Sequence, residues 1–245
     1  MKTLNYIKEQ KAQDIIYNKL INGMYNSTKK SVDKELIYSL KKMTKNTGEV
    51  TYTNKKELTN LFKVVKENIT QLERTEAQSL VNKLTSDIQK EKDRQEKLLS
   101  IKIKEPAVDL SFKDYIKINT EELNNNINTA IKRTLINRKK RTEAEDMLLK
   151  KVDKEFQTAA NKAQTLATTQ SAEQAMNTIM EAFKQADLKE FEWVAEPDGC
   201  KHCRAFDGKT FKIGAQVPPL HPRCRCTARP KRKVDKLNGS QNFRT

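Results

Sequence analysis

The sequence predicts a mainly α protein: an elongated body of long helices, followed by a small C-terminal α+β module rich in Cys and His and built around a hairpin. Glycine and proline, the strongest markers of turns, are confined to Gly23, Gly48 and Pro106 in the region up to Glu190. The remaining glycines and prolines, all four cysteines and both histidines follow Glu190. With 36% apolar and 33% charged residues, helices with a narrow apolar seam fit better than a thick globular core.

One long helix is predicted from apolar residues that recur every three or four positions. The pattern forms an amphipathic helix of about 40 residues. Such a helix favours packing within its own domain, with an intermolecular coiled coil as the alternative. The seam is formed by Leu58, Phe62, Val65, Ile69 and Leu72 and, after a skip, by Ala77, Val81, Leu84 and Ile88.

The remaining elements follow from similar patterns. A second helix is expected over 120–141, and a third over 143–186 with a break near Thr168–Ser171, where Thr and Ser cluster. The second helix places Leu123, Ile127, Ala130, Ile131 and Leu135 on one side.

The N-terminal 50 residues predict less regular helix. Thr47–Val50 predicts a turn, and Ile101–Lys104 predicts a short extended connector before Pro106. We therefore divide the chain into a helical region (1–110), a second helical region (111–190), a Cys/His-rich module (191–230) and a basic, disordered tail (231–245).

The module carries a candidate metal site. Cys200 and Cys203, two residues apart after Gly199, have the spacing with which a tight turn holds one metal ion. Asp207-Gly208 predicts a hairpin turn that would bring this pair next to Cys224 and Cys226.

The ligand set stays open. Cys224 and Cys226 would point to opposite faces of a strand, so His221 is an alternative to one sulfur. We expect one structural Zn²⁺ held by four of the five residues; disulfides or reduced thiols are the alternatives. His202 is expected to be exposed rather than a ligand.

The net charge of +16 favours a polyanionic partner, although mixed Lys and Glu are also typical of solvated helix faces. We expect non-specific contact with double-stranded DNA through two basic segments. The alternatives are a solvated helix face for the first and a solubilising end for the second. The candidate residues are Arg138, Lys139, Lys140 and Arg141, and then Arg229, Lys231, Arg232 and Lys233.

Several classes of protein are not expected. No HExxH, GxSxG or Gly-rich phosphate motif occurs, and the turn contexts of Asp198 and Asp207 explain both residues, so we expect no enzyme activity. No apolar run is long enough for a membrane helix, and the N-terminus lacks the apolar core of a signal peptide. We therefore expect synthesis in a cytoplasm, where clustered cysteines bind metal more often than they form disulfides.

The C-terminal pattern resembles the signature of the phage Mu F-like head morphogenesis proteins, which are minor head proteins. The matching residues cover only about 40 positions and run in the order W…D…CxxC…DGKxF…PPxHPxCRC. In this family an Arg-Thr-Glu-containing helix precedes the signature. Ala167–Gln170 takes that place here without the Arg or the Glu, which indicates a divergent member. The signature residues are Trp193, Asp198, Cys200, Cys203, Asp207–Lys209, Phe211 and Pro218–Cys226.

The resemblance implies a protein that is made in the cytoplasm of a bacterial host and carried in the virion, inside the phage head. It implies that the protein acts in capsid or procapsid assembly at the portal vertex. It implies the portal protein, and a scaffold or major capsid protein, as partners. It also implies contact with packaged DNA and, in some members, ejection with that DNA. The alternative is a zinc-stabilised nucleic-acid-binding protein acting in the host cell.

Overall fold

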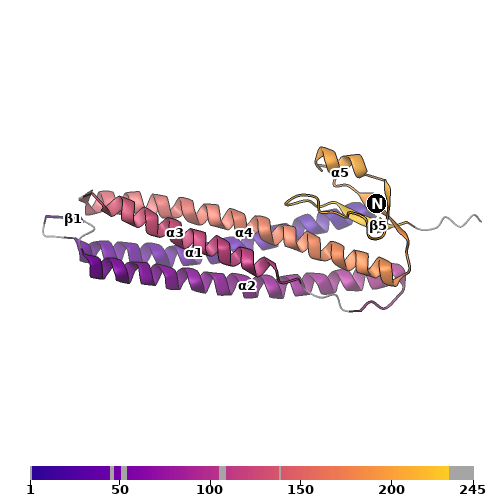
Figure 1. Cartoon of the computed structure of the whole chain (residues 1–245), viewed down its shortest axis with the longest axis horizontal. Helices are drawn as coiled ribbons and strands as arrows, with labels where there is room; N and C mark the ends of the chain where they lie inside the picture. The colour runs from indigo at the N-terminus through magenta and orange to yellow at the C-terminus, as the bar shows by residue number, and fades with distance from the viewer. Residues whose placement is uncertain (1, 45–46, 51–53, 105–108, 138, 232–245) are drawn as a thin grey trace, which may run out of the picture.

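The computed structural model describes residues 2–44, 47–50, 54–104, 109–137 and 139–231, and its body is a four-helix bundle (Figure 1). The helices are α1 (Lys2–Met43), α2 (Lys55–Leu99), α3 (Phe112–Leu135) and α4 (Arg141–Gln185). Because an α-helix rises 1.5 Å per residue, the 45 residues of α4 span about 68 Å. This confirms the predicted elongated helical body.

The predicted seam of α2 is buried inside the bundle. Leu58, Val65, Ile69 and Leu72 belong to a core shared by all four long helices. The skip in the apolar pattern is a buried carboxylate, because Glu76 occupies the next seam position and is fully buried. Further along α2, Glu91 and Gln95 are buried in the same way.

Three predicted helix features were wrong. The first helix is regular rather than irregular and runs unbroken to Met43. The second starts earlier than expected, at Phe112, and ends at Leu135 instead of near Arg141, which is the first residue of α4. The third is unbroken: the hydroxyls of Thr168 and Thr169 donate to the carbonyl oxygens four residues earlier, at 2.9 and 2.7 Å. Threonine is accommodated in a helix when its hydroxyl bonds back in this way.

A short two-stranded ribbon lies at one end of the bundle. Strand β1 (Glu49–Val50) pairs antiparallel with β2 (Lys139–Lys140). It joins the α1–α2 connection to the α3–α4 connection (Figure 1). The predicted turn at Thr47–Val50 is therefore half turn and half strand. Ile101–Lys104, the predicted connector, lies outside the helices.

The C-terminal module lies at the opposite end, beside the N-terminus of α1 (Figure 1). It contains β3 (Glu190–Val194), α5 (Lys201–Phe206), β4 (Thr210–Lys212) and β5 (Thr227–Pro230). Strand β3 is central and pairs antiparallel with β4 and β5. The predicted Asp207-Gly208 turn exists, with Gly208 at φ +72°, but it joins α5 to β4. The two cysteine pairs are therefore brought together across β3, not by a hairpin at this turn.

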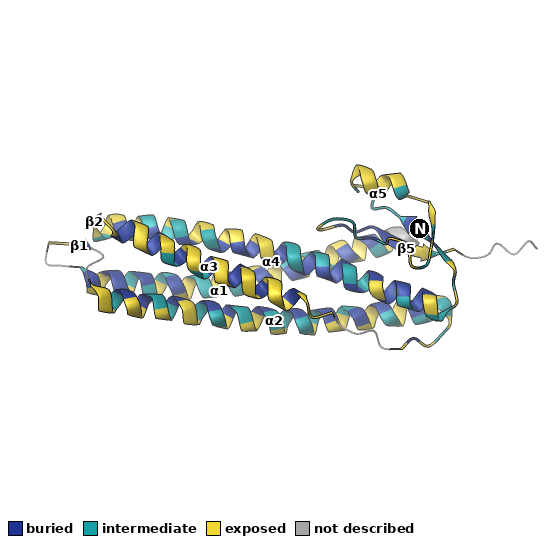
Figure 2. Ribbon diagram, in the orientation of Figure 1, coloured by how far each residue is buried: buried dark blue, intermediate teal, exposed yellow. Residues whose placement is uncertain are grey.

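The module shares its core with the end of α4. Met176, Ile179 and Phe183 pack in one buried cluster with Phe191 and Trp193 of β3. Figure 2 shows this buried layer continuing from α4 into the sheet. The module is thus fixed to the bundle by apolar packing. Among the described residues, no helix has a stretch apolar enough, over a sufficient length, to cross a membrane.

Candidate metal centre

The first cysteine pair sits at the start of α5. Cys200 caps this helix, and its Sγ accepts a hydrogen bond from the backbone N–H of Cys203 at 3.5 Å. The preceding turn is tight: Gly199 N–H donates to Glu196 O at 2.8 Å. A Cβ at position 199 would lie only 2.8 Å from that carbonyl oxygen, which explains why glycine precedes the pair.

The second group of donors lies in an irregular turn, not in a strand. Cys224 N–H donates to His221 O at 3.2 Å, and Arg223 adopts the left-handed region with φ 60°. His221 Nδ1 lies 2.9 Å from Pro222 O. Since a carbonyl oxygen can only accept a hydrogen bond, Nδ1 carries the hydrogen and donates it. Nε2 therefore keeps its lone pair for a metal ion.

The two groups converge on Cys203. Its Sγ lies 3.6 Å from His221 Nε2 and 3.7 Å from Cys224 Sγ. One triad with donor atoms mutually within 4.8 Å is Cys200, Cys203 and His221, and another is Cys203, Cys224 and Cys226.

These distances match those between ligands of a tetrahedral metal. Zinc–sulfur bonds of about 2.3 Å and zinc–nitrogen bonds of about 2.0 Å give S···S and S···N separations of about 3.8 and about 3.5 Å in a tetrahedron. The expectation that Cys224 and Cys226 face opposite sides was wrong, because their Sγ atoms lie within 4.8 Å of each other in one triad. The Cys/His group can therefore hold a metal ion.

Hydrogen bonds and burial shift the pKa values of these cysteine thiols in opposite directions. Cys226 Sγ accepts a hydrogen bond from Glu196 N–H at 3.4 Å. A hydrogen bond from the Cys226 thiol, together with backbone N–H groups, lowers the pKa of Cys224 to about 5, whereas burial raises the pKa of Cys203 to about 12. Without a cation, the Cys224 sulfur is thus a thiolate at neutral pH, while Cys203 keeps its proton. A bound cation favours the thiolate form of each of its ligands.

All four cysteines are free thiols in this structure. Cys203, Cys224 and Cys226 are buried, while Cys200 is exposed. His202 is exposed, as expected, and belongs to neither donor triad.

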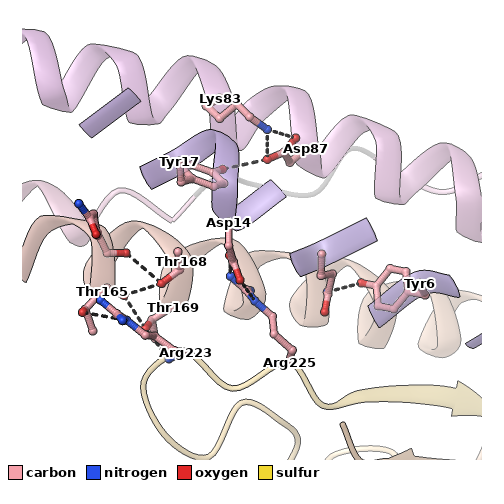
Figure 3. Close-up of polar contacts among 12 residues, drawn as sticks. Tyr6, Asp14, Tyr17, Lys83, Asp87, Thr165, Thr168, Thr169, Arg223 and Arg225 are labelled. Atoms are coloured by element: carbon pink, nitrogen blue, oxygen red, sulfur yellow. Dashed lines mark hydrogen bonds and ion pairs between the residues drawn. The ribbon is translucent and has the colours of Figure 1, made fainter. Parts of the chain in front are cut away.

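A buried ion pair attaches this site to the bundle. Arg225, between the last two cysteines, is 2% exposed and forms a two-pronged ion pair with Asp14 of α1 (Figure 3). Its Nε lies 2.8 Å from Asp14 Oδ2. Burial lowers the pKa of Arg225 to about 10, so the guanidinium remains charged at neutral pH.

Three further contacts flank that ion pair. Arg223 donates from its backbone N–H to Thr169 Oγ1 at 3.2 Å and from Nε to Thr165 Oγ1 at 3.1 Å, both on α4 (Figure 3). Lys11 of α1 pairs with Glu196 at 2.6 Å. The module is therefore held by α1 on one side and by α4 on the other.

The predicted DNA-contacting residues lie in two groups at opposite ends of the bundle (Figure 1). Near β5, Arg229 pairs with Glu192, and Lys231 pairs with Glu190 at 3.3 Å. At the β2 end, Lys139 pairs with Glu143 at 3.2 Å, and Lys140 is exposed beside the half-buried Arg141. Arg138, Arg232 and Lys233 lie outside the described residues.

Comparison with known protein families found a match for the region that contains the metal centre. Residues 125–229 match the family model described as Phage Mu protein F like protein. The chain carries a Mu F-like region. This confirms, for residues 125–229, the resemblance to the phage Mu F-like head morphogenesis proteins noted in the sequence. The match covers less than half of the chain and leaves out α1, α2 and the first part of α3. No curated protein and no solved structure matches the chain.

Sequence reasoning missed the partner of the Mu F-like region. Asp14 lies on α1, 211 residues before Arg225. The available signal was Arg225, the arginine between Cys224 and Cys226. A buried guanidinium needs a carboxylate partner, so its position between two cysteines of a small core pointed to an acidic residue elsewhere in the chain.

Proposed function

We propose that this protein is a non-catalytic minor head protein that acts in capsid or procapsid assembly at the portal vertex, with the portal protein and a scaffold or major capsid protein as partners. The observation that carries the proposal is the family match, which includes the second part of α3, all of α4 and nearly the whole module. The shape supports it, since the bundle is long enough to bridge two components of a head while the module marks one end.

The same proposal includes contact with packaged DNA. A net charge of +16 attracts a polyanion. At the β2 end, Lys140 is exposed and Arg141 half-buried, whereas Arg229 and Lys231 already pair with acids of β3. We therefore place the main contact of the described residues with DNA phosphates at the β2 end.

We further propose that the metal is zinc and that it is structural. Three cysteine thiolates with an imidazole, or four thiolates, are typical ligands of structural zinc. With four protein ligands, a tetrahedral zinc site has no open position for a substrate.

Mass spectrometry of purified virions and procapsids tests the role in the head. We expect peptides of this chain in both particles, at a few copies per portal. Their complete absence from both, with the protein abundant in infected cells, would contradict the proposal and favour a nucleic-acid-binding role in the host.

Cobalt substitution tests the identity of the ligands. Tetrahedral Co²⁺ bound by thiolates shows strong visible absorption and sulfur-to-metal charge transfer, whose intensity increases with the number of thiolates. We expect a tetrahedral spectrum with three or four sulfurs that zinc displaces. An octahedral spectrum, or none, would contradict a Cys/His site of this kind.

A further inference from the structure

The metal centre and the first part of α1 are joined by Arg225. This residue follows Cys224 and precedes Cys226. Its guanidinium is not part of the metal site but pairs with Asp14 on α1. This helix lies outside the Mu F-like match. The backbone that presents two candidate metal ligands therefore also presents the arginine.

The ion pair is well shielded from water. The side chains of Arg225 and Asp14 are 3% and 23% exposed. Removing one partner from a buried charge pair is costly, because the other charge is left without compensation. Docking of Asp14 thus depends strongly on where the Cys224–Cys226 turn holds Arg225.

One face of this part of α1 lines a cavity instead of packing fully against the bundle. The cavity, of about 260 Å³, lies between α1, α2 and α4, and its lining includes the polar residues Tyr6, Gln10, Glu91 and Gln174. Gln10 Oε1 is buried without a hydrogen-bond partner. A helix that rests on a cavity loses packing contacts there, so its attachment to the module contributes more to its stability.

We propose that metal binding at the cysteine cluster and docking of the first four turns of α1 are thermodynamically coupled through the Arg225–Asp14 ion pair. The inference rests on the proposed metal site. Bound metal fixes the Cys224–Cys226 turn and places Arg225 against Asp14; loss of the metal frees the turn and weakens the hold on α1. The start of α1 then changes its exposure with metal occupancy, at the end of the bundle that carries the module.

Coupling of this kind is reciprocal: if the metal favours docking, docking must favour the metal by the same factor. The test variant is Asp14→Asn, which leaves every candidate ligand and its neighbours intact. Asp33→Asn is the matched control, since Asp33 also lies on α1, is 19% exposed and pairs with Lys29 at 2.8 Å, away from the module.

Zinc affinity of the full-length protein is measured by competition with a chromophoric chelator. We expect Asp14→Asn to weaken zinc binding about 5- to 150-fold, the usual range of coupling between two sites. Asp33→Asn should match the wild type. Equal affinities for the wild type and Asp14→Asn would overturn the coupling while leaving the metal site intact. A wild type that binds no zinc would instead overturn the metal site itself.

Hydrogen–deuterium exchange of the wild type keeps the proposal testable if Asp14→Asn folds poorly. Chelation should speed exchange in residues 5–20 and leave residues 116–131 of α3 unchanged. Unchanged exchange in residues 5–20, with zinc demonstrably removed, would overturn the coupling.

Discussion

Tyr25 of α1 donates its hydroxyl to Glu76 Oε2 of α2 at 3.0 Å, in the middle of the bundle. Asn119 of α3 donates to the same hydroxyl at 3.0 Å and to Ala159 O of α4 at 3.0 Å. One polar cluster thus touches all four long helices. Buried polar contacts of this type can fix the register of packed helices.

The first prediction concerns pH. Burial raises the pKa of Glu76 to about 7, and that of Glu91 to about 7 for the same reason. A carboxyl whose pKa is higher in the folded state holds its proton there while the unfolded chain has released it. Stability from these groups is therefore present at low pH and is lost as the pH rises from about 4.5 to about 7.

Glu76→Gln should remove that loss for one group. We expect the variant to gain about 1–3 kcal/mol relative to the wild type at pH 8, and much less at pH 5, measured by urea unfolding at both pH values. Glu67→Gln, an exposed change on the same helix, is the control. A wild type and Glu76→Gln that differ equally at pH 5 and pH 8 would show that Glu76 does not titrate in this range.

The second prediction uses the single tryptophan as a reporter. Trp193 is 1% exposed and contacts Phe206 and Phe211, with ring centroids 5.2 and 5.8 Å away. Because these rings share a core with Cys203, chelation should loosen them and shift Trp193 emission to longer wavelength. Emission that stays unchanged after complete removal of metal would mean that the core does not depend on the ion.

The third prediction concerns DNA. Binding should weaken steeply with salt and show little sequence preference, since phosphate contacts release counterions. Replacing Lys140 and Arg141 by Gln should reduce the magnitude of the salt slope by about 2. Lys150 and Lys162, which already pair with Asp146 and Glu122, provide the control pair. Equal slopes for the two double variants would place the DNA contact elsewhere.

The fourth prediction concerns the contacts of the module with α4. Arg223→Ala removes the bond from its Nε to Thr165 but keeps the backbone bond to Thr169. Since the lost bond is exposed, we expect a cost of about 0.5–1.5 kcal/mol in thermal unfolding. A loss of zinc in Arg223→Ala would show that this side chain also shapes the metal turn.

The helices α2 and α3 could be predicted from the sequence because the spacing of their apolar residues repeats regularly. Glu76 and Glu91 were missed, since a charged residue at a seam position looks like an interruption when its buried partners are not known. Thr168 and Thr169 suggested a break because propensity does not record the hydroxyl bonds that satisfy them within α4.

The convergence of the cysteine pairs could be predicted from their spacing. The strand pairing that brings them together could not. Gly208 marks a turn, yet the partner of β4 is β3, which precedes the first cysteine pair. Arg223 adopts the left-handed region just before Cys224, and its residue type gives no signal of that turn. Asp14 is too distant in sequence for local patterns to connect it with Arg225.

Native mass spectrometry of the purified protein tests most directly whether the two cysteine pairs form one metal centre. The account predicts one zinc ion per chain in the wild type and none in Cys203→Ser, because Cys203 belongs to both donor triads. A wild type without bound metal, whose four thiols all react with a thiol reagent or are joined in disulfides, would contradict it.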